Sequence, residues 1–116
     1  MPVRSLDSSV LKWPDRLTVD RAVREWAQAA ARRQNVVRIG YAGSYARGDW
    51  GPGSDVDILV VVRVVDVPFT RRALEWDATE LPVPADVLVY TEDEWLEQER
   101  EGRRLAREAV WVIQMK

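Results

Sequence analysis

One stretch of the sequence decides the fold: GSYARGDWGPGSDVDILVVV, residues 43–62. It joins a glycine-rich segment, residues 43–54, to an apolar run from Asp55 to Val65. Four glycines and a proline in the first segment indicate a loop with at most one helical turn. The run that follows is apolar on both faces from Ile58 to Val62, which is typical of a central strand in a covered sheet.

The segments around this stretch alternate between strand and helix patterns. Strands are expected over residues 36–42, 55–65, 85–90 and 110–114. Helices are expected over residues 19–33, with Thr18 as N-cap, over 69–81, and from Thr91 onward, with a break at Gly102 and a continuation over 103–108. Thr91 and Glu94 form a capping box at the start of that last helix. Residues 1–14 have an irregular pattern.

This order of elements predicts one small α/β (α+β) domain over residues 1–116. The chain has no cysteine and no histidine, which excludes disulfides, thiolate zinc sites and Ser-His-Asp triads. Catalysis would therefore depend on carboxylates, hydroxyls, arginine or lysine, with a metal ion held by oxygen atoms.

The net charge of −2 argues against general binding to a nucleic-acid backbone, so we expect no direct contact with nucleic acid. The longest apolar run, Val56 to Val62, is the length of a strand, and residues 1–9 lack the apolar core of a signal peptide. We therefore expect a cytoplasmic protein without a membrane segment.

Acidic residues at the starts of apolar strands are the main candidates for chemistry. Asp55 and Asp57 are two residues apart, so both side chains would lie on one face of a strand, with Cα atoms about 6.6 Å apart. Two carboxylates beside a buried strand raise each other's pKa, and a divalent cation relieves that cost. Asp86 begins a second apolar strand and would lie beside Asp57 if the two strands pair. Three carboxylates could hold two Mg²⁺ or Mn²⁺ ions.

The glycine-rich loop could bind an anion. Gly43 and Ser44 directly follow a predicted strand, and backbone N–H groups at the start of a helical turn bind phosphate. Arg47, three residues after Ser44, could add a guanidinium to the same phosphate. Each feature also has a purely structural interpretation: a glycine-rich turn with a solvated arginine, or a solvated Asp-x-Asp strand end. Their occurrence together favours the phosphate site.

Gly43-Ser44, ten further residues and Asp55-Val56-Asp57 resemble the signature of the polymerase-beta-like nucleotidyltransferases. The longer string resembles the minimal nucleotidyltransferases, which include the antitoxin partners of HEPN-domain toxins. The resemblance covers residues 36–90 and implies a mixed sheet flanked by helices. It implies that Asp55 and Asp57 bind Mg²⁺ and that Asp86 is the third carboxylate, which activates the attacking hydroxyl.

The same resemblance implies that Gly43 and Ser44 hold the β- and γ-phosphates of ATP, with help from Arg47. Ser54 would orient the loop or simply cap it. Because no segment is left to bind an acceptor, the resemblance implies transfer of AMP to a hydroxyl of a HEPN partner, commonly a tyrosine, within a homo- or hetero-oligomer.

Two other functions remain open from the sequence. The protein could neutralise its partner by occlusion alone, or it could modify a small molecule. Six tryptophans are many for this length. Five of them, Trp13, Trp26, Trp76, Trp95 and Trp111, mostly fit core faces, which favours a core role over partner contacts. Trp50, in the loop, could stack on a base, meet a partner or anchor the loop.

Overall fold

The computed structural model describes residues 13–33 and 35–115. The strands are β1 (Val36–Ala42), β2 (Val56–Val62), β3 (Ala85–Thr91) and β4 (Val110–Gln114). The helices are α2 (Arg16–Ala30), α3 (Ser44–Arg47), α4 (Phe69–Arg72), the 3-10 turn η1 (Ala73–Glu75), α5 (Glu92–Arg100) and α6 (Arg104–Glu108). Most of the predicted irregular segment 1–14 lies outside the described residues, and Trp13 and Pro14 are irregular as expected.

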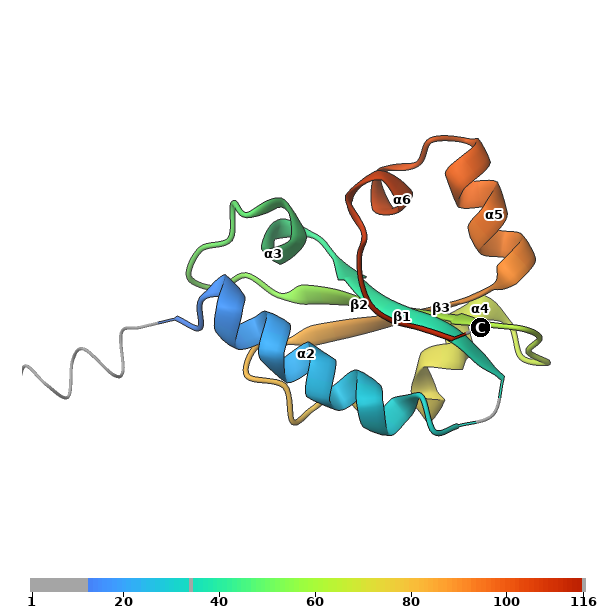
Figure 1. Ribbon diagram of the computed structural model, residues 1–116, viewed down its shortest axis with the longest axis horizontal. Coiled ribbons are helices and arrows are strands. Elements are labelled where there is room, and N and C mark those ends of the chain that lie inside the picture. Colours follow the sequence, from blue (N-terminus) through green and yellow to red (C-terminus); the bar gives the residue numbers. More distant parts are fainter. Residues whose placement is uncertain (1–12, 34, 116) are drawn as a thin grey trace, which may run out of the picture.

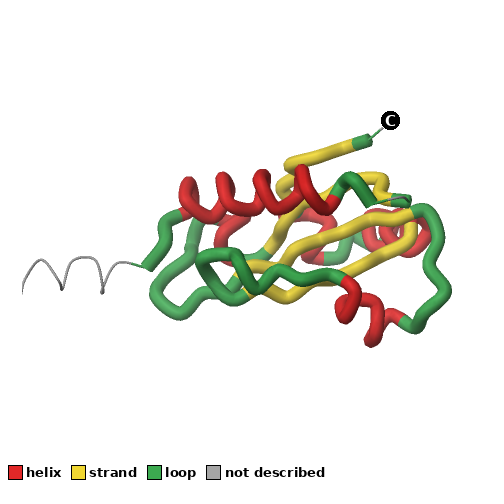
Figure 2. The backbone as a smooth tube through the Cα atoms, turned by 90° about the horizontal axis from the view of Figure 1, so that it is seen from below, coloured by secondary structure: helices red, strands yellow, loops and turns green. Residues whose placement is uncertain are grey.

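The four strands form one mixed sheet in the order β3-β2-β1-β4. β1 runs antiparallel to both β2 and β4, whereas β2 and β3 are parallel. The prediction that β2 is a central strand is confirmed, as is the mixed sheet flanked by helices. In Figure 2 the strand that ends beside the label C, β4, lies at one margin of the sheet.

Helices cover both faces of the sheet (Figure 1). On one face, Val23 and Trp26 of α2 pack with Ile58 and Val60 of β2 in the larger core. On the other face, Trp95 of α5 packs against Leu59 in a smaller cluster. Because successive side chains of β2 alternate between these two cores, the strand is apolar throughout its buried length.

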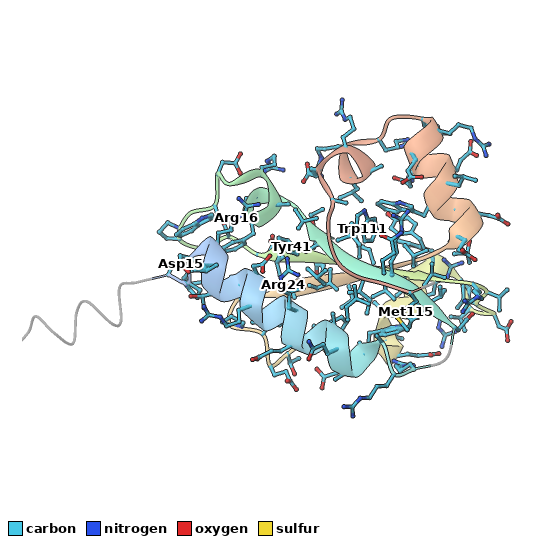
Figure 3. All side chains as sticks on the ribbon, viewed as in Figure 1. Asp15, Arg16, Arg24, Tyr41, Trp111 and Met115 are labelled. Atoms are coloured by element: carbon cyan, nitrogen blue, oxygen red, sulfur yellow. The ribbon has the colours of Figure 1, made fainter. Side chains whose placement is uncertain are left out.

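Two aromatic residues of the sheet show how the layers meet (Figure 3). Trp111 of β4 lies on the α5 face, where its ring meets Trp95 edge to face at 5.2 Å between centroids. A Cβ atom at Gly40 would lie 2.7 Å from the Trp111 ring, so glycine allows β4 to pair closely with β1 here. On the α2 face, Tyr41 donates a hydrogen bond to Asp20 at 2.7 Å, and burial with this contact raises the pKa of Tyr41 to about 12.

The predicted start of α2 and the predicted end of β2 are wrong, and side-chain hydrogen bonds explain both; α2 also ends at Ala30 rather than at the predicted Arg33. α2 begins at Arg16 with Asp15 as N-cap, because the Asp15 carboxylate accepts from the Thr18 N–H at 2.8 Å. Thr18 therefore lies inside the helix. β2 ends at Val62 because the side chain of Asn35 accepts from the N–H groups of Arg63 and Val64, which turns the chain.

The predicted helix over residues 69–81 is also wrong beyond its first turns. α4 and η1 together end at Glu75, and Trp76 takes an extended conformation. Its ring packs against Trp26 of α2 at 6.3 Å between centroids and lies 4.0 Å below the Arg33 guanidinium. A continued helix would give up this packing across two elements, so tertiary contacts override local helical spacing.

Arg72 is a buried cation that closes one end of the open edge of β3. Its guanidinium donates to the carbonyl groups of Val67 and Val89 at 2.9 and 3.0 Å. It also forms a two-point ion pair with Glu94, at 2.6 and 3.1 Å, which holds the pKa of Glu94 below its usual value. Glu94 completes the predicted capping box of α5 with Thr91, so one ion pair joins α4, β3 and α5.

None of the helices in the described part of the chain has the length and apolar character that crossing a membrane requires.

We expect Arg72→Ala to lower the free energy of unfolding by about 2 to 3 kcal/mol, because it leaves two carbonyl groups and Glu94 without their donor. Urea unfolding measures this difference, with the exposed neighbour Arg71→Ala as a matched control. Because Arg72 stabilises the charged form of Glu94, the difference should shrink as the pH falls below about 4.3. A loss no larger than that of the control would contradict the assigned role.

Candidate active site

The predicted pair of aspartates on neighbouring strands is present. In the parallel register of β2 and β3, Asp57 lies directly opposite Asp86. Asp57 is half-buried on the β2 face that carries Leu59, whereas Asp86 is exposed at the sheet edge. Asp55 is exposed and lies one residue before β2 begins.

Electrostatic repulsion and burial in this arrangement disfavour the charged form of Asp57. Burial raises the pKa of Asp57, and the negative charges of Asp55 and Asp86 raise it further. Arg104 lowers the same pKa, and Glu108 adds a further repulsive charge. The negative charges around Asp57 therefore outnumber the positive charges that compensate them.

Carboxylate oxygens are the ligands that Mg²⁺ and Mn²⁺ prefer, and a cation would relieve the repulsion at Asp57. In donor type and in charge, the three aspartates thus fit a divalent ion. Within residues 13–33 and 35–115, however, no three such ligands are already gathered around one point.

The Gly43–Ser44 turn lies beside Asp57. Gly43 follows β1, whose last residue, Ala42, pairs with Asp57 in the antiparallel register. Its φ of 95° favours glycine, and a Cβ atom there would lie 3.3 Å from Oδ2 of Asp57. The predicted helical turn after it is α3, whose first N–H groups, those of Ser44 and Tyr45, have no acceptor within the helix.

Arg47 lies at the end of α3 and contacts carboxylates. Its Nε donates to Asp49 at 3.1 Å, and its Nη1 donates to both oxygens of Glu108, at 3.1 and 3.3 Å. The structure therefore brings Arg47 to the turn, as predicted, but in an ion-paired state.

Sequence reasoning missed Glu108 and Arg104. Glu108, at the end of α6, accepts a hydrogen bond from the Gly43 N–H at 2.6 Å. Arg104, one helical turn earlier, donates to Glu108 at 3.2 Å. Their spacing of four residues in the segment expected to be helical was the available signal. That spacing indicates an ion pair on a helix, but it does not indicate the contact with Gly43.

Two loop residues have structural roles. Trp50 stacks on the buried Tyr45 ring at 5.6 Å between centroids, with the planes 7° apart, so it anchors the loop. Ser54 accepts a hydrogen bond from the Gly51 N–H at 2.9 Å, which makes it a cap of the turn before Asp55.

A groove of 790 Å³ lies at the open edge of β3. Asp57 and Asp86 line it together with Trp76, Thr79 and Pro84. The aspartate pair is therefore accessible to a molecule that approaches along this edge.

We expect Asp57→Asn to raise the melting temperature of the metal-free protein at neutral pH. The pKa of Asp57 is raised in the folded state, so the wild type loses stability as the pH rises above about 4, and the uncharged amide does not. Thermal unfolding in a chelator measures the effect, with the exposed Asp66→Asn as control. A melting temperature equal to or below that of the control would show that the charge costs the fold nothing.

Comparison with solved structures identifies the same architecture elsewhere. A crystal structure assigned as a nucleotidyltransferase, from Sulfolobus solfataricus, matches with a TM-score of 0.64 and 22% identity, over 85% of this chain and 83% of the other. The crystal structure of a toxin-antitoxin with AMP-PNP matches with a TM-score of 0.51 and 14% identity, over 89% of this chain and 76% of the other. At these identities the likeness shows the fold. Among curated proteins, no sequence matches.

The family model described as "Nucleotidyltransferase domain" matches residues 23–112, which contain both strands of the aspartate pair, the Gly43–Ser44 turn and α6. This match covers well over half of the chain and agrees with the fold of the solved structures. The chain therefore belongs to the nucleotidyltransferase domain family.

Proposed function

We propose that the protein is a metal-dependent nucleotidyltransferase that transfers AMP from ATP to a hydroxyl of a HEPN-type toxin and so acts as its antitoxin. The observation that carries this proposal is the position of Asp57 opposite Asp86, next to the Gly43 turn. Carboxylates for a metal ion and backbone donors for a phosphate lie side by side there, in a chain of the nucleotidyltransferase family.

In the proposed reaction, the acceptor oxygen forms a bond to the α-phosphorus while the bond from that phosphorus to pyrophosphate breaks. Asp86, exposed at the β3 edge, would accept the proton of the hydroxyl. Asp55, Asp57 and Asp86 would hold Mg²⁺, or Mn²⁺, which when bound supplies positive charge to the phosphates.

The turn after β1 would hold the two phosphates that leave. The N–H groups at the start of α3 and the Ser44 hydroxyl are donors for phosphate oxygens. Arg47 would add charge from the end of α3, where Glu108 and Asp49 already fix its guanidinium. These contacts would align the departing pyrophosphate with the acceptor side of the groove.

Several observations support an acceptor on another protein. Tyr41 and Tyr45 of this chain are buried, so their hydroxyls cannot reach a nucleotide at the site. Tyr90 packs between Phe69 and Trp95. The toxin-antitoxin with AMP-PNP shares the fold, which is consistent with a hetero-oligomer of this chain and a toxin.

A second candidate function is neutralisation by binding alone. It is favoured by two observations: the Gly43 N–H and part of the Arg47 guanidinium already donate to Glu108 and Asp49, and no three carboxylates of the described residues are arranged to hold a metal ion. In this alternative the protein covers its partner's active surface without modifying it.

We expect incubation with Mg²⁺, ATP and the co-purified partner to add the mass of one AMP to the partner, as measured by intact-mass spectrometry. Asp57→Asn should slow this transfer by at least about 100-fold, because it removes a charge that holds the metal. Asp66→Asn is the matched control. No adduct with any nucleoside triphosphate, in wild type and Asp57→Asn alike, would contradict transfer to that partner.

Growth of cells that express the partner toxin separates catalysis from occlusion. If the protein acts by AMP transfer, the double variant Asp55→Asn, Asp57→Asn should fail to neutralise the toxin while still co-purifying with it. Full neutralisation by that variant would favour occlusion.

A further inference from the structure

We infer that Glu108 is a positioning residue of the nucleotide site, which fixes the Gly43–Ser44 turn and holds Arg47 and Arg104 beside it. This inference rests on the proposed nucleotide transfer, because it assigns Glu108 a role in binding the same triphosphate. It adds a residue that lies more than 20 positions further along the sequence to a site that the motif places entirely between residues 43 and 86.

The Glu108 carboxylate is the meeting point of three donors. The Gly43 N–H donates to it at 2.6 Å, Arg47 Nη1 at 3.1 Å and Arg104 Nη1 at 3.2 Å. Its side chain is only 10% exposed, whereas those of Arg47 and Arg104 are 41% and 59% exposed. The Gly43 contact has the short length of a hydrogen bond to a charged acceptor, and the two longer arginine contacts converge on the same largely buried carboxylate.

The contact with Gly43 controls the geometry of the turn. Gly43 is buried, and its N–H has no strand or helix partner. Since Ala42 is already fixed by its pairing with Asp57, the Glu108 contact restrains the chain at the point where it leaves β1 and enters α3. The Glu108 carboxylate, on α6, thereby helps to orient the N–H groups of Ser44 and Tyr45.

The contacts with arginine control the charge near the site. Glu108 lies between two cations, and Asp49 also pairs with Arg47, so these four side chains together carry no net charge. Each guanidinium has five N–H donors; Glu108 takes donors from Nη1 of each and Asp49 takes Nε of Arg47, which leaves others for a phosphate oxygen. Arg104 already acts on Asp57, because its charge lowers the pKa of that carboxyl.

The opposite role would be competition: a carboxylate that occupies donors meant for phosphate. The two roles predict opposite effects of removing Glu108 on ATP affinity. Positioning predicts weaker binding, because the turn and both arginines lose their restraint. Competition predicts tighter binding, because the donors become free.

Isothermal titration of ATP with Mg²⁺ against Glu108→Ala tests the inference. We expect the dissociation constant to rise by about tenfold or more, as the loss of a charge-assisted hydrogen-bond network implies. The matched control is Glu97→Ala, an exposed carboxylate of α5 that pairs with Arg100, which should stay within about twofold of wild type. Unchanged or tighter binding to a folded Glu108→Ala protein would overturn the inference.

A double-mutant cycle separates positioning from a general loss of stability. If Glu108 acts through Arg47, then Arg47→Gln should weaken ATP binding clearly in the wild type and little in the Glu108→Ala background. Equal effects in both backgrounds would overturn the inference. If Glu108→Ala does not fold, Glu108→Gln decides: about three- to tenfold weaker binding supports positioning, and unchanged or tighter binding overturns it.

The same titrations distinguish this inference from the proposed function. Wild-type protein that binds ATP, together with an unaffected Glu108→Ala variant, overturns the inference alone. If neither wild type nor variant binds any nucleoside triphosphate, the proposed function fails and the inference fails with it.

Discussion

The repulsion among the carboxylates at the start of β2 is the constraint on which the rest of the structure depends. Asp57 is half-buried in β2, a strand that has no other polar side chain, and it lies opposite Asp86 of β3. A half-buried carboxylate with negative neighbours destabilises the folded state. It persists because the apolar remainder of β2 is held firmly between two hydrophobic cores.

Several neighbouring residues affect the space or the charge around the Asp57 carboxylate. Gly43 allows the chain to pass close to Oδ2, where a side chain would crowd the carboxylate. Arg104 supplies a nearby positive charge, and Glu108 connects that arginine to the turn. Arg72, at the other end of β3, closes the sheet edge away from the site and leaves the end beside Asp86 open to the groove. The edge of β3 is therefore covered at the end near Arg72 and accessible at the end beside Asp86, where the negative charges lie.

The local parts of this design could be predicted from the sequence, and the long-range parts could not. The proximity of Asp57 and Asp86 was expected on the condition that the two apolar strands pair, which they do, and the Thr91–Glu94 capping box followed from a spacing of three. The end of the helix at Glu75 could not be predicted, since it depends on Trp76 meeting Trp26, 50 residues away in the chain. Asp15 and Thr18 are both good N-caps, and only the backbone conformation at Asp15 selects the first. Glu108 carries no local signal for its contact with Gly43.

The hydrogen bond from Gly43 to Glu108 spans 65 positions of the chain. Because closing a long loop costs conformational entropy before the contact contributes, we expect this contact to form after those between nearer neighbours. The central strands and their capping box can assemble from nearer neighbours. The Gly43–Ser44 turn would then take its final shape only when the segment that carries Glu108 has docked on the sheet. Under the proposed function, a chain that is still incompletely folded would thus lack the nucleotide site of the finished domain, which would tie substrate capture to the completion of folding.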